Sequence, residues 1–297
     1  MSSSGIGVND PTVDGGYRGR IAPTPSGYLH LGHARTFWTA MLRARRRRGD
    51  LILRMDDLDP GRSKPEYINA AVEDLNWFGI DWREGSERKP SDGPFYQSQR
   101  MDFYRAALHR LIDLGRVYRC YCSRKDVRNA SLAPHAGDEG PLYSGKCRAN
   151  VGIETPQSSD RVPCWRFRVE SGGCVRFRDG ARGDVSFTAG VDFGDFVVWR
   201  QDGVPAYQLA VVVDDHEMGV TEVVRGEDLL LSTCRQILIF EALGWGIPDF
   251  FHCPLMLNDA GERLSKRSDS MALRDYRARG WSPERIREEF GWDDVSA

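Results

Sequence analysis

A loop rich in proline and glycine joins a short segment to a long helical run, and two histidines stand where that run begins. The loop comprises Ala22–Gly27, the histidines are His30 and His33, and the run covers Ala34–Arg48. Side chains three residues apart share one face of the first helical turn. The free N–H groups and positive dipole end of such a turn attract anions. The segment therefore predicts a phosphate site with two imidazole donors.

The composition of the chain is that of an ordinary globular protein. Its 297 residues allow one large domain or two modest ones, and 40% of them are hydrophobic. The net charge of −2 means that any surface for nucleic acid must be local. Seven cysteines, an odd number, argue against a disulfide scaffold.

The sequence shows neither a membrane anchor nor a secretion signal. No stretch approaches the roughly 20 apolar residues of a membrane span. The first residues lack the basic and apolar parts of a signal peptide. We expect a cytoplasmic protein, a monomer without membrane contacts, that begins with a disordered tail over residues 1–16.

Strands and helices alternate through most of the chain. The short segment Arg18–Ala22, which leads into the Pro/Gly loop, predicts a strand, and the apolar run Leu51–Met55 predicts a buried strand. A capping box at Ser63–Glu66 and a cap at Ser98 predict the starts of two helices. Such alternation is typical of an α/β fold, in which a parallel sheet carries helices on its faces.

The character of the sequence changes after the first three helical runs. We expect residues 118–190, which begin with a polar passage rich in Gly and Pro, to form an insertion with its own small core. The run Ala206–Val213 is too short and apolar to assign from its periodicity, although its three valines favour a strand. Segments Val220–Arg225 and Phe250–Leu257 predict further strands, with the helix Leu229–Leu243 between them.

Charged side chains stand near the ends of the predicted strands. Arg20 belongs to the first strand, Asp56 to the second and Arg225 to a later one, while Lys266 follows the last. Ligands of open α/β sheets bind at the carboxyl ends of the strands, so these residues predict one site. Two guanidinium groups beside a carboxylate suit a zwitterion, whereas histidines and a lysine suit phosphate. An amino acid and a nucleotide that meet there would imply adenylation.

Two motifs at opposite ends of the chain carry a family resemblance. His30-Leu-Gly-His33 resembles the first signature of class I aminoacyl-tRNA synthetases, and Leu264-Ser-Lys-Arg-Ser268 resembles the second. Four further segments are similar to the glutamyl branch of that class, namely Arg20–Gly27, Leu53–Asp59, Ala206–Asp215 and Arg225–Asp228. Because the chain ends at residue 297, where glutamyl-tRNA synthetases continue into a helical anticodon-binding domain, it looks like a member of the glutamyl-Q tRNA(Asp) synthetases.

The resemblance implies both an architecture and a reaction. It implies a Rossmann-like catalytic domain over residues 17–117 and 191–270, an inserted α+β subdomain with zinc that binds the acceptor over 118–190, and a short helical extension over 271–297. That family activates L-glutamate with ATP and Mg²⁺ and transfers it to queuosine in the anticodon of tRNA(Asp). It also implies a helix at Ala206–Val213, so both assignments stay open there.

The resemblance further implies roles for individual residues. Arg20 and Arg225 would hold glutamate, Arg225 at the side-chain carboxylate, and Asp56 would bind the α-ammonium group, where the family usually has Glu. The glutamate site would comprise Arg20, Ile21, Ala22, Pro23, Thr24, Asp56, Tyr207 and Arg225. The catalytic residues would be His30, His33 and Lys266, and the ATP site would comprise His30, Gly32, His33, Leu264, Ser265 and Lys266.

A group of four residues matches a zinc site of this family: Cys120, Cys122, Tyr143 and Cys147. Three thiolates and a phenolate would close the coordination sphere, as in structural rather than catalytic sites. From spacing alone, a reduced and partly buried cysteine cluster is an equal alternative.

Other features admit more than one interpretation. The arginines of segment Arg43–Arg48 form either a solvated helix face or a contact for an RNA backbone. Segment Asp214–His216 looks like a metal cluster, although we favour the polar end of a strand or helix that lines the acceptor site. We expect five tryptophans to be core or half-buried residues: Trp77, Trp82, Trp165, Trp199 and Trp245.

Three other functions remain compatible with the sequence. The chain could be a truncated glutamyl-tRNA synthetase that charges a tRNA 3′ end. It could be a paralogue that binds tRNA without catalysis, although intact His30, His33 and Lys266 argue against that. It could also adenylate an amino acid for an acceptor other than RNA.

Overall fold

A seven-stranded sheet forms the centre of the computed structural model, which describes residues 16–85, 95–122, 142–148, 162–256 and 271–292. The strand order is β3-β2-β1-β9-β10-β6-β7. Neighbouring strands pair in parallel as far as β6, and β6 pairs with β7 in antiparallel fashion. The strands are β1 (Arg18–Ile21), β2 (Asp50–Leu53), β3 (Glu84–Gly85), β9 (Glu222–Gly226), β10 (Asp249–Cys253), β6 (Cys174–Asp179) and β7 (Gly183–Thr188).

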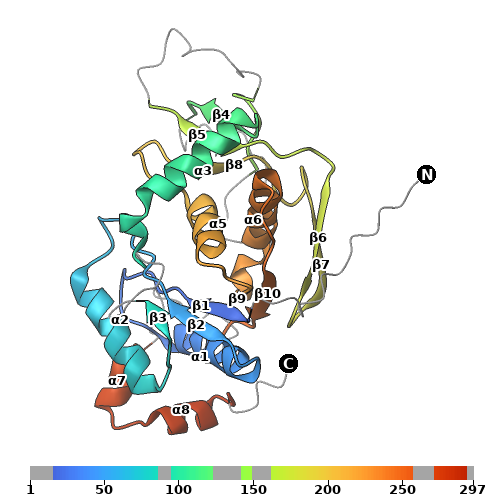
Figure 1. Ribbon diagram of the computed structural model, residues 1–297. Coiled ribbons are helices and arrows are strands. Elements are labelled where there is room, and N and C mark those ends of the chain that lie inside the picture. Colours follow the sequence, from blue (N-terminus) through green and yellow to red (C-terminus); the bar gives the residue numbers. More distant parts are fainter. Residues whose placement is uncertain (1–15, 86–94, 123–141, 149–161, 257–270, 293–297) are drawn as a thin grey trace.

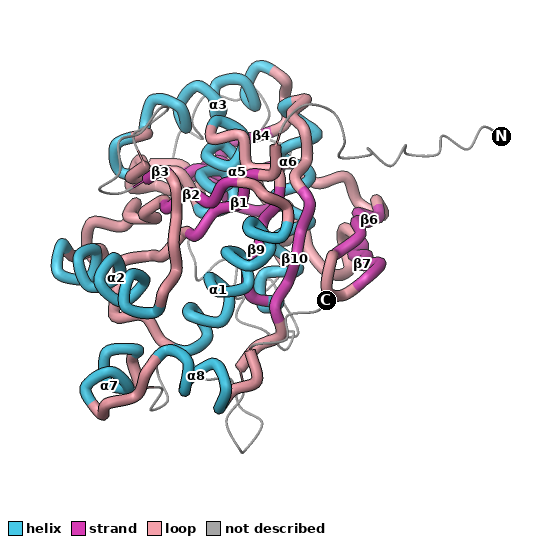
Figure 2. The backbone as a smooth tube through the Cα atoms, turned by 60° about the horizontal axis from the view of Figure 1, so that its bottom comes forward, coloured by secondary structure: helices cyan, strands magenta, loops and turns pink. Residues whose placement is uncertain are grey.

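Helices cover both faces of this sheet (Figure 1). Helix α1 (Leu31–Arg46) lies across one face, as Figure 2 shows, beside α2 (Pro65–Phe78). On the other side lie α5 (Tyr207–Glu217) and α6 (Leu230–Leu243), with α3 (Met101–Asp113) packed against them. Two short helices, α7 (Leu273–Ala278) and α8 (Pro283–Glu289), end the described chain. This parallel α/β architecture confirms the fold class predicted from the alternation of strands and helices.

The alternation of side chains along the strands explains why helices are needed on both faces. In β2, Leu51 and Leu53 join the core beneath α1 and α2, whereas Ile52 belongs to a core on the opposite side. The neighbouring strands repeat the pattern, with Val224 on the first face and Val223 on the second. Burial on both faces is typical of parallel strands.

A second sheet of three strands lies at one end of the molecule (Figure 1). It consists of β4 (Val117–Cys120), β5 (Cys164–Phe167) and β8 (Phe196–Trp199), paired in antiparallel fashion. Segment 118–190 thus contributes to both sheets, because β6 and β7 extend the larger one. Phe177 of β6 packs against Phe250 of β10, with ring centroids 5.7 Å apart.

The structure decides one open assignment and corrects two expectations. The valine-rich run lies in helix α5, as the family resemblance implies and not as its valines suggest; residues from Leu209 to Asp215 are all buried, and a helix buried all round shows no amphipathic period. The first residue before α2 is Lys64, and no side chain caps that helix. Ser98 binds the carboxylate of Asp57 in a short turn before α3, which begins only at Met101.

None of the described helices is long and apolar enough to cross a membrane.

A buried carboxylate holds α5 against its neighbours. Asp214 accepts hydrogen bonds from Arg100 Nε at 2.7 Å, from Gln97 Nε2 at 2.8 Å and from the Tyr104 hydroxyl at 2.9 Å. A further guanidinium, that of Arg54, lies 3.6 Å away. Burial raises the pKa of Asp214, although the charges of Arg54 and Arg100 oppose that shift. Asp214 is therefore neither a metal ligand nor part of an open acceptor surface.

Replacing this carboxylate should destabilise the fold strongly. We expect Asp214→Asn to lower the free energy of unfolding by about 3–5 kcal/mol, because it removes a buried anion that faces Arg100 and Arg54. Urea denaturation followed by circular dichroism measures the change. Asp102→Asn is the matched control, since Asp102 pairs with Arg105 at 2.9 Å on the surface. Equal urea midpoints for the two variants would contradict this assignment.

Candidate functional site

Three of the predicted substrate residues come together at the carboxyl ends of adjacent strands. Arg20 lies on β1, Arg225 lies on β9, and Asp56 follows β2. Strand β1 pairs with both of the others, so the three side chains share one edge of the sheet. Arg20 Nη1 donates to the carbonyl oxygen of Val224 at 2.9 Å, which ties the first guanidinium to the neighbouring strand.

The two histidines form a reciprocal cap at the start of α1. His30 Nδ1 accepts a hydrogen bond from the backbone N–H of Gly32 at 3.1 Å, and His33 Nδ1 accepts one from the N–H of His30 at 3.3 Å. A ring nitrogen that accepts carries no proton, so each neutral imidazole holds its proton on Nε2. The two rings lie against each other at a tilt of 31°, with centroids 3.8 Å apart. Both rings are thereby fixed as Nε2–H donors at a helix N-terminus.

Close contacts around this cap explain two further features of the sequence. A Cβ atom on Gly32 would lie only 3.1 Å from His30 Cε1, so glycine leaves room for the ring. Ala272 pairs with His30 in an isolated bridge, and Leu273 N–H donates to Leu29 O at 2.7 Å. The chain that precedes α7 therefore returns beside the histidines. The predicted ATP-site residues Leu264, Ser265 and Lys266 lie outside the described residues.

A chain of buried ion pairs links Asp56 to Arg20. Arg54 Nε lies 2.7 Å from Asp56 Oδ1, and Arg54 Nη1 lies 2.8 Å from Asp215 Oδ1. The same oxygen of Asp215 is 3.4 Å from Arg20 Nε. Burial raises the pKa of Asp56 to about 6, although the Arg54 charge opposes the shift. Sequence reasoning missed Arg54, whose only signal was its place between an apolar strand and the acidic residues after it.

The guanidinium of Arg225 lacks an anionic partner among the described residues. It is 4% exposed, and it contacts the Thr233 hydroxyl at 2.6 Å, the Tyr207 hydroxyl at 3.4 Å and His252 Nε2 at 3.2 Å. Burial lowers the pKa of Arg225 from its ordinary value. A buried cation among neutral groups is costly unless an anion joins it. The site is thus prepared for a carboxylate or another small anion.

The buried side chain of His252 fixes the orientation of the Arg225 guanidinium. His252 Nδ1 lies 2.6 Å from Asp179 Oδ2, and the His252 backbone N–H donates to the other oxygen at 3.3 Å. With the Nδ1 proton facing this carboxylate, Nε2 accepts from Arg225 Nε. Burial and the charge of Arg225 both lower the pKa of His252. The lowered pKa favours the neutral ring. Neither His252 nor Asp179 was found from the sequence, because their contact depends on the pairing of β10 with β6.

The remaining predicted glutamate residues surround this edge of the sheet. Ile21 and Pro23 are buried, Ala22 is half-buried and Thr24 is exposed. The carbonyl of Pro23 accepts from the Asp56 N–H at 3.0 Å, which holds the loop against the end of β2. Tyr207, the first residue of α5, is 42% exposed.

A separate cluster contains the predicted metal ligands. Cys122 Sγ lies 3.5 Å from Cys147 Sγ, and the Tyr143 hydroxyl lies 3.5 Å from Cys120 Sγ and 3.6 Å from Cys122 Sγ. Within the described residues, these three cysteines are the one group of His, Cys, Asp and Glu side chains arranged to hold a metal ion. Arg166 Nε donates to Cys120 Sγ at 3.3 Å. A hydrogen bond from Cys164, with the Arg166 contact, lowers the pKa of Cys120 well below its usual value.

Part of the arginine run at the end of α1 serves the fold. Arg43 Nη2 lies 2.7 Å from Glu222 Oε1, and Arg47 Nη2 lies 3.5 Å from the same oxygen. The hydrogen bond and charge of Arg43 lower the pKa of Glu222 despite the opposing effect of its burial. Arg45 and Arg48 are exposed and stay available for other contacts.

Comparison with known proteins agrees with this geometry. Residues 17–292 match the family described as tRNA synthetases class I (E and Q), catalytic domain. The chain is 48% identical to a glutamyl-Q tRNA(Asp) synthetase of Symbiobacterium thermophilum, over 90% of this chain and 83% of that protein. It is 46% identical to a protein of the same name from Nitratidesulfovibrio vulgaris, over 89% of this chain and 82% of that protein.

A solved structure has the same fold. A glutamate tRNA ligase of Elizabethkingia meningosepticum, crystallised with its amino acid, superimposes with a TM-score of 0.74 at 30% identity. The match covers 85% of this chain and 52% of that chain. The chain therefore belongs to the class I tRNA synthetases (E and Q), a family of ligases, and is similar along most of its length to glutamyl-Q tRNA(Asp) synthetases.

Proposed function

We propose that the protein activates L-glutamate with ATP and transfers the glutamyl group to queuosine in the anticodon of tRNA(Asp). The observation that carries the amino-acid part is Arg225, a buried guanidinium without an anion among the described residues. The acceptor is supported by the name of two relatives that are 48% and 46% identical to the chain.

Glutamate satisfies the charges at the sheet edge in one orientation. Its side-chain carboxylate neutralises Arg225, which His252 and Thr233 hold in place. Its ammonium group meets Asp56. Arg20, which pairs with Asp215, lies on the strand between the one that precedes Asp56 and the one that carries Arg225. Tyr207 borders the position of the side-chain carboxylate, since its hydroxyl lies 3.4 Å from Arg225 Nη1. A substrate without the second carboxylate would leave the buried cation unpaired, which is a strong basis for selection.

The reaction needs positioned donors rather than a base. An oxygen of the glutamate α-carboxylate attacks the α-phosphorus of ATP, and the bond to pyrophosphate breaks. His30 and His33 donate their Nε2 protons to phosphate oxygens, and Lys266 binds the departing pyrophosphate. Mg²⁺ that arrives with ATP would neutralise phosphate charge. A queuosine hydroxyl then attacks the adenylate carbonyl, loses its proton and releases AMP.

The acceptor is tested by comparing two forms of one RNA. We expect tRNA(Asp) that carries queuosine to accept radiolabelled glutamate, and the unmodified transcript to accept essentially none. Equal charging of both would instead favour a truncated glutamyl-tRNA synthetase that acts on the 3′ end. Absence of glutamate-dependent ATP–pyrophosphate exchange would favour a paralogue without catalysis. Exchange without charging of either RNA would point to a different acceptor.

Glutamate binding should weaken as the pH falls through the pKa of Asp56, which is about 6. Above that pH the carboxylate is charged and attracts ammonium, whereas below it a proton competes. We expect Kd for glutamate, measured by calorimetry without ATP, to rise about tenfold per pH unit below 6. The carboxyl groups of glutamate titrate near 4, so they contribute little in this range.

Two variants distinguish the effect of the Asp56 carboxylate on glutamate binding from that of a neighbouring carboxylate. Asp56→Asn should bind glutamate weakly at every pH and lose most of the pH dependence. Asp57→Asn is the matched control, because its carboxylate is occupied by Ser98 at 2.6 Å and 2.8 Å. A pH profile that survives in Asp56→Asn would refute the assignment of Asp56 to the ammonium group.

The cysteine cluster fits a structural zinc ion. Zn–S bonds of about 2.3 Å and a Zn–O bond of about 2.0 Å would separate tetrahedral ligand atoms by roughly 3.5–3.8 Å. The distances of 3.5 Å and 3.6 Å that join Cys120, Cys122, Tyr143 and Cys147 are close to that range. The guanidinium of Arg166 would offset part of the negative charge. Bound zinc would fix the loop residues to β4.

Metal analysis tests this assignment directly. We expect the purified protein to contain about one zinc ion per chain. Cys122→Ser should lose most of the zinc and melt at a lower temperature. Cys174→Ser is the control, because Cys174 is exposed and lies outside the cluster. Zinc-free protein from zinc-containing medium, or full occupancy in Cys122→Ser, would exclude the site.

A further inference from the structure

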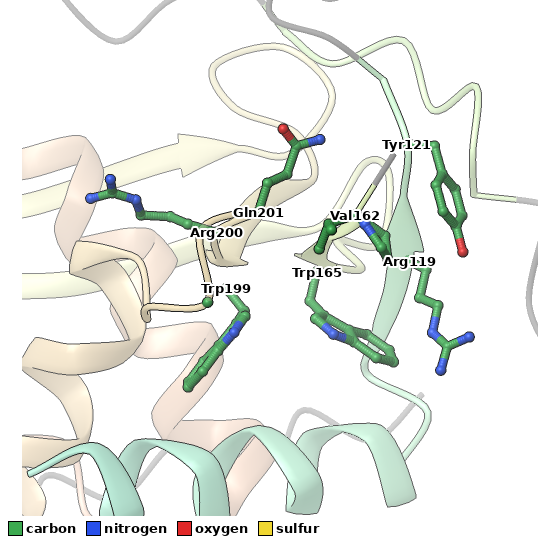
Figure 3. Close-up of a pocket in the computed structure, with 9 residues that line it drawn as sticks. Arg119, Tyr121, Val162, Trp165, Trp199, Arg200 and Gln201 are labelled. Atoms are coloured by element: carbon green, nitrogen blue, oxygen red, sulfur yellow. The ribbon is translucent and has the colours of Figure 1, made fainter. Parts of the chain in front are cut away.

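A pocket of about 370 Å³ lies on the three-stranded sheet, apart from the residues assigned to glutamate and ATP. Figure 3 shows its tryptophan side chains below the turn that carries Arg200 and Gln201. None of its lining residues carries a negative charge, and two are arginines. The lining residues are Arg119, Tyr121, Val162, Pro163, Trp165, Trp199, Arg200, Gln201 and Gly203.

Three of these side chains form a row across the sheet. Arg119 on β4 pairs in register with Trp165 on β5, which pairs with Trp199 on β8. Residues opposite one another on neighbouring strands point to the same face. The Arg119 guanidinium lies 5.3 Å from the centre of the Trp165 ring. Both tryptophans are half-buried, so the sheet anchors them while part of each ring stays open.

The cations of the pocket differ in their freedom to bind a ligand. Arg200 is held by the carboxylate of Asp202 on the same turn. Arg119 is exposed and forms no ion pair with any residue that the structure describes. A phosphate group near the tryptophans would therefore meet Arg119 first.

We propose that this pocket receives an unpaired base of the tRNA substrate, which stacks on Trp165 or Trp199 while its phosphate contacts Arg119. Single-stranded RNA is recognised in this way, by stacking on aromatic rings next to basic side chains. The volume lies at the lower end of the roughly 300–1,000 Å³ typical of small-ligand sites. The inference rests on the proposed function only in that RNA is the acceptor.

The position of the pocket favours a role in delivering the acceptor. Trp199 bridges to Pro205, and Ala206 N–H donates to Val198 O at 2.8 Å. The next residue, Tyr207, begins α5 and contacts Arg225. The turn that borders the pocket thus continues directly into the proposed glutamate site. A base held here would anchor the RNA next to the activated amino acid.

The test uses variants with a matched pair elsewhere in the molecule. Arg119→Glu and Trp199→Ala change the pocket, and Trp199→Phe keeps an aromatic face. Arg285→Glu and Trp281→Ala are the controls, because Arg285 is an exposed arginine 4.0 Å from the ring centre of half-buried Trp281. Those control residues belong to α8 and the turn before it, at the opposite end of the molecule from β4, β5 and β8 (Figure 1).

The readout is the Kd of fluorescently labelled tRNA(Asp) with queuosine, measured by anisotropy on variants with native circular dichroism. We expect Kd to rise about tenfold or more in Arg119→Glu and Trp199→Ala, and much less in Trp199→Phe and both controls. ATP–pyrophosphate exchange, which involves no RNA, should stay at the wild-type rate.

Unchanged Kd in both pocket variants, an equal loss in the controls, or a parallel loss of exchange would overturn the inference. So would a wild-type protein that binds no tRNA. Charging assays decide the proposed acceptor separately, because a protein that charges an unmodified transcript can still depend on Arg119 and Trp199 for binding it.

Discussion

A buried guanidinium surrounded by neutral partners sets the character of the proposed active site. Close by, three arginines and three aspartates form a buried cluster in which the charges balance: Arg20, Arg54, Arg100, Asp56, Asp214 and Asp215. Arg225 stands outside that balance and contacts only a histidine, a hydroxyl and a phenol as polar side-chain partners among the described residues. These contacts hold the cation in place without neutralising it, and the proposed substrate would supply the missing anion.

Much of the site followed from the sequence because parallel strands bring their carboxyl ends together. Arg20, Asp56 and Arg225 were predictable as neighbours once their strands were recognised, and His30 and His33 were predictable from the helix start. Periodicity did not reveal helix α5, because a helix that is buried all round has no periodic polar face; only the family resemblance implied it. The supporting residues were also hidden. The roles of Arg54 and His252 depend on contacts with Asp215 and Asp179, which lie 161 and 73 residues away in the chain.

The three-stranded sheet carries different chemistry on its two faces. Cys120, Cys164 and Arg166 lie on one face with the cysteine cluster, while Trp165 lies on the other with its cross-strand neighbours. The proposed metal site and the proposed base pocket therefore share strands β4 and β5. An ion bound on one face would stiffen the strands that align the aromatic row on the other.

The β6–β7 hairpin has a consequence for how this chain can change in evolution. Through Asp179 and His252 it reaches the Arg225 guanidinium, which we propose binds glutamate, although the hairpin lies at the far edge of the sheet. Strands added at a sheet edge are usually free to vary in length. Here the edge strand supplies Asp179, which holds His252 against Arg225. If Arg225 binds the amino acid as proposed, a shortened or exchanged hairpin would disturb that binding, so the hairpin and the site would have to evolve together.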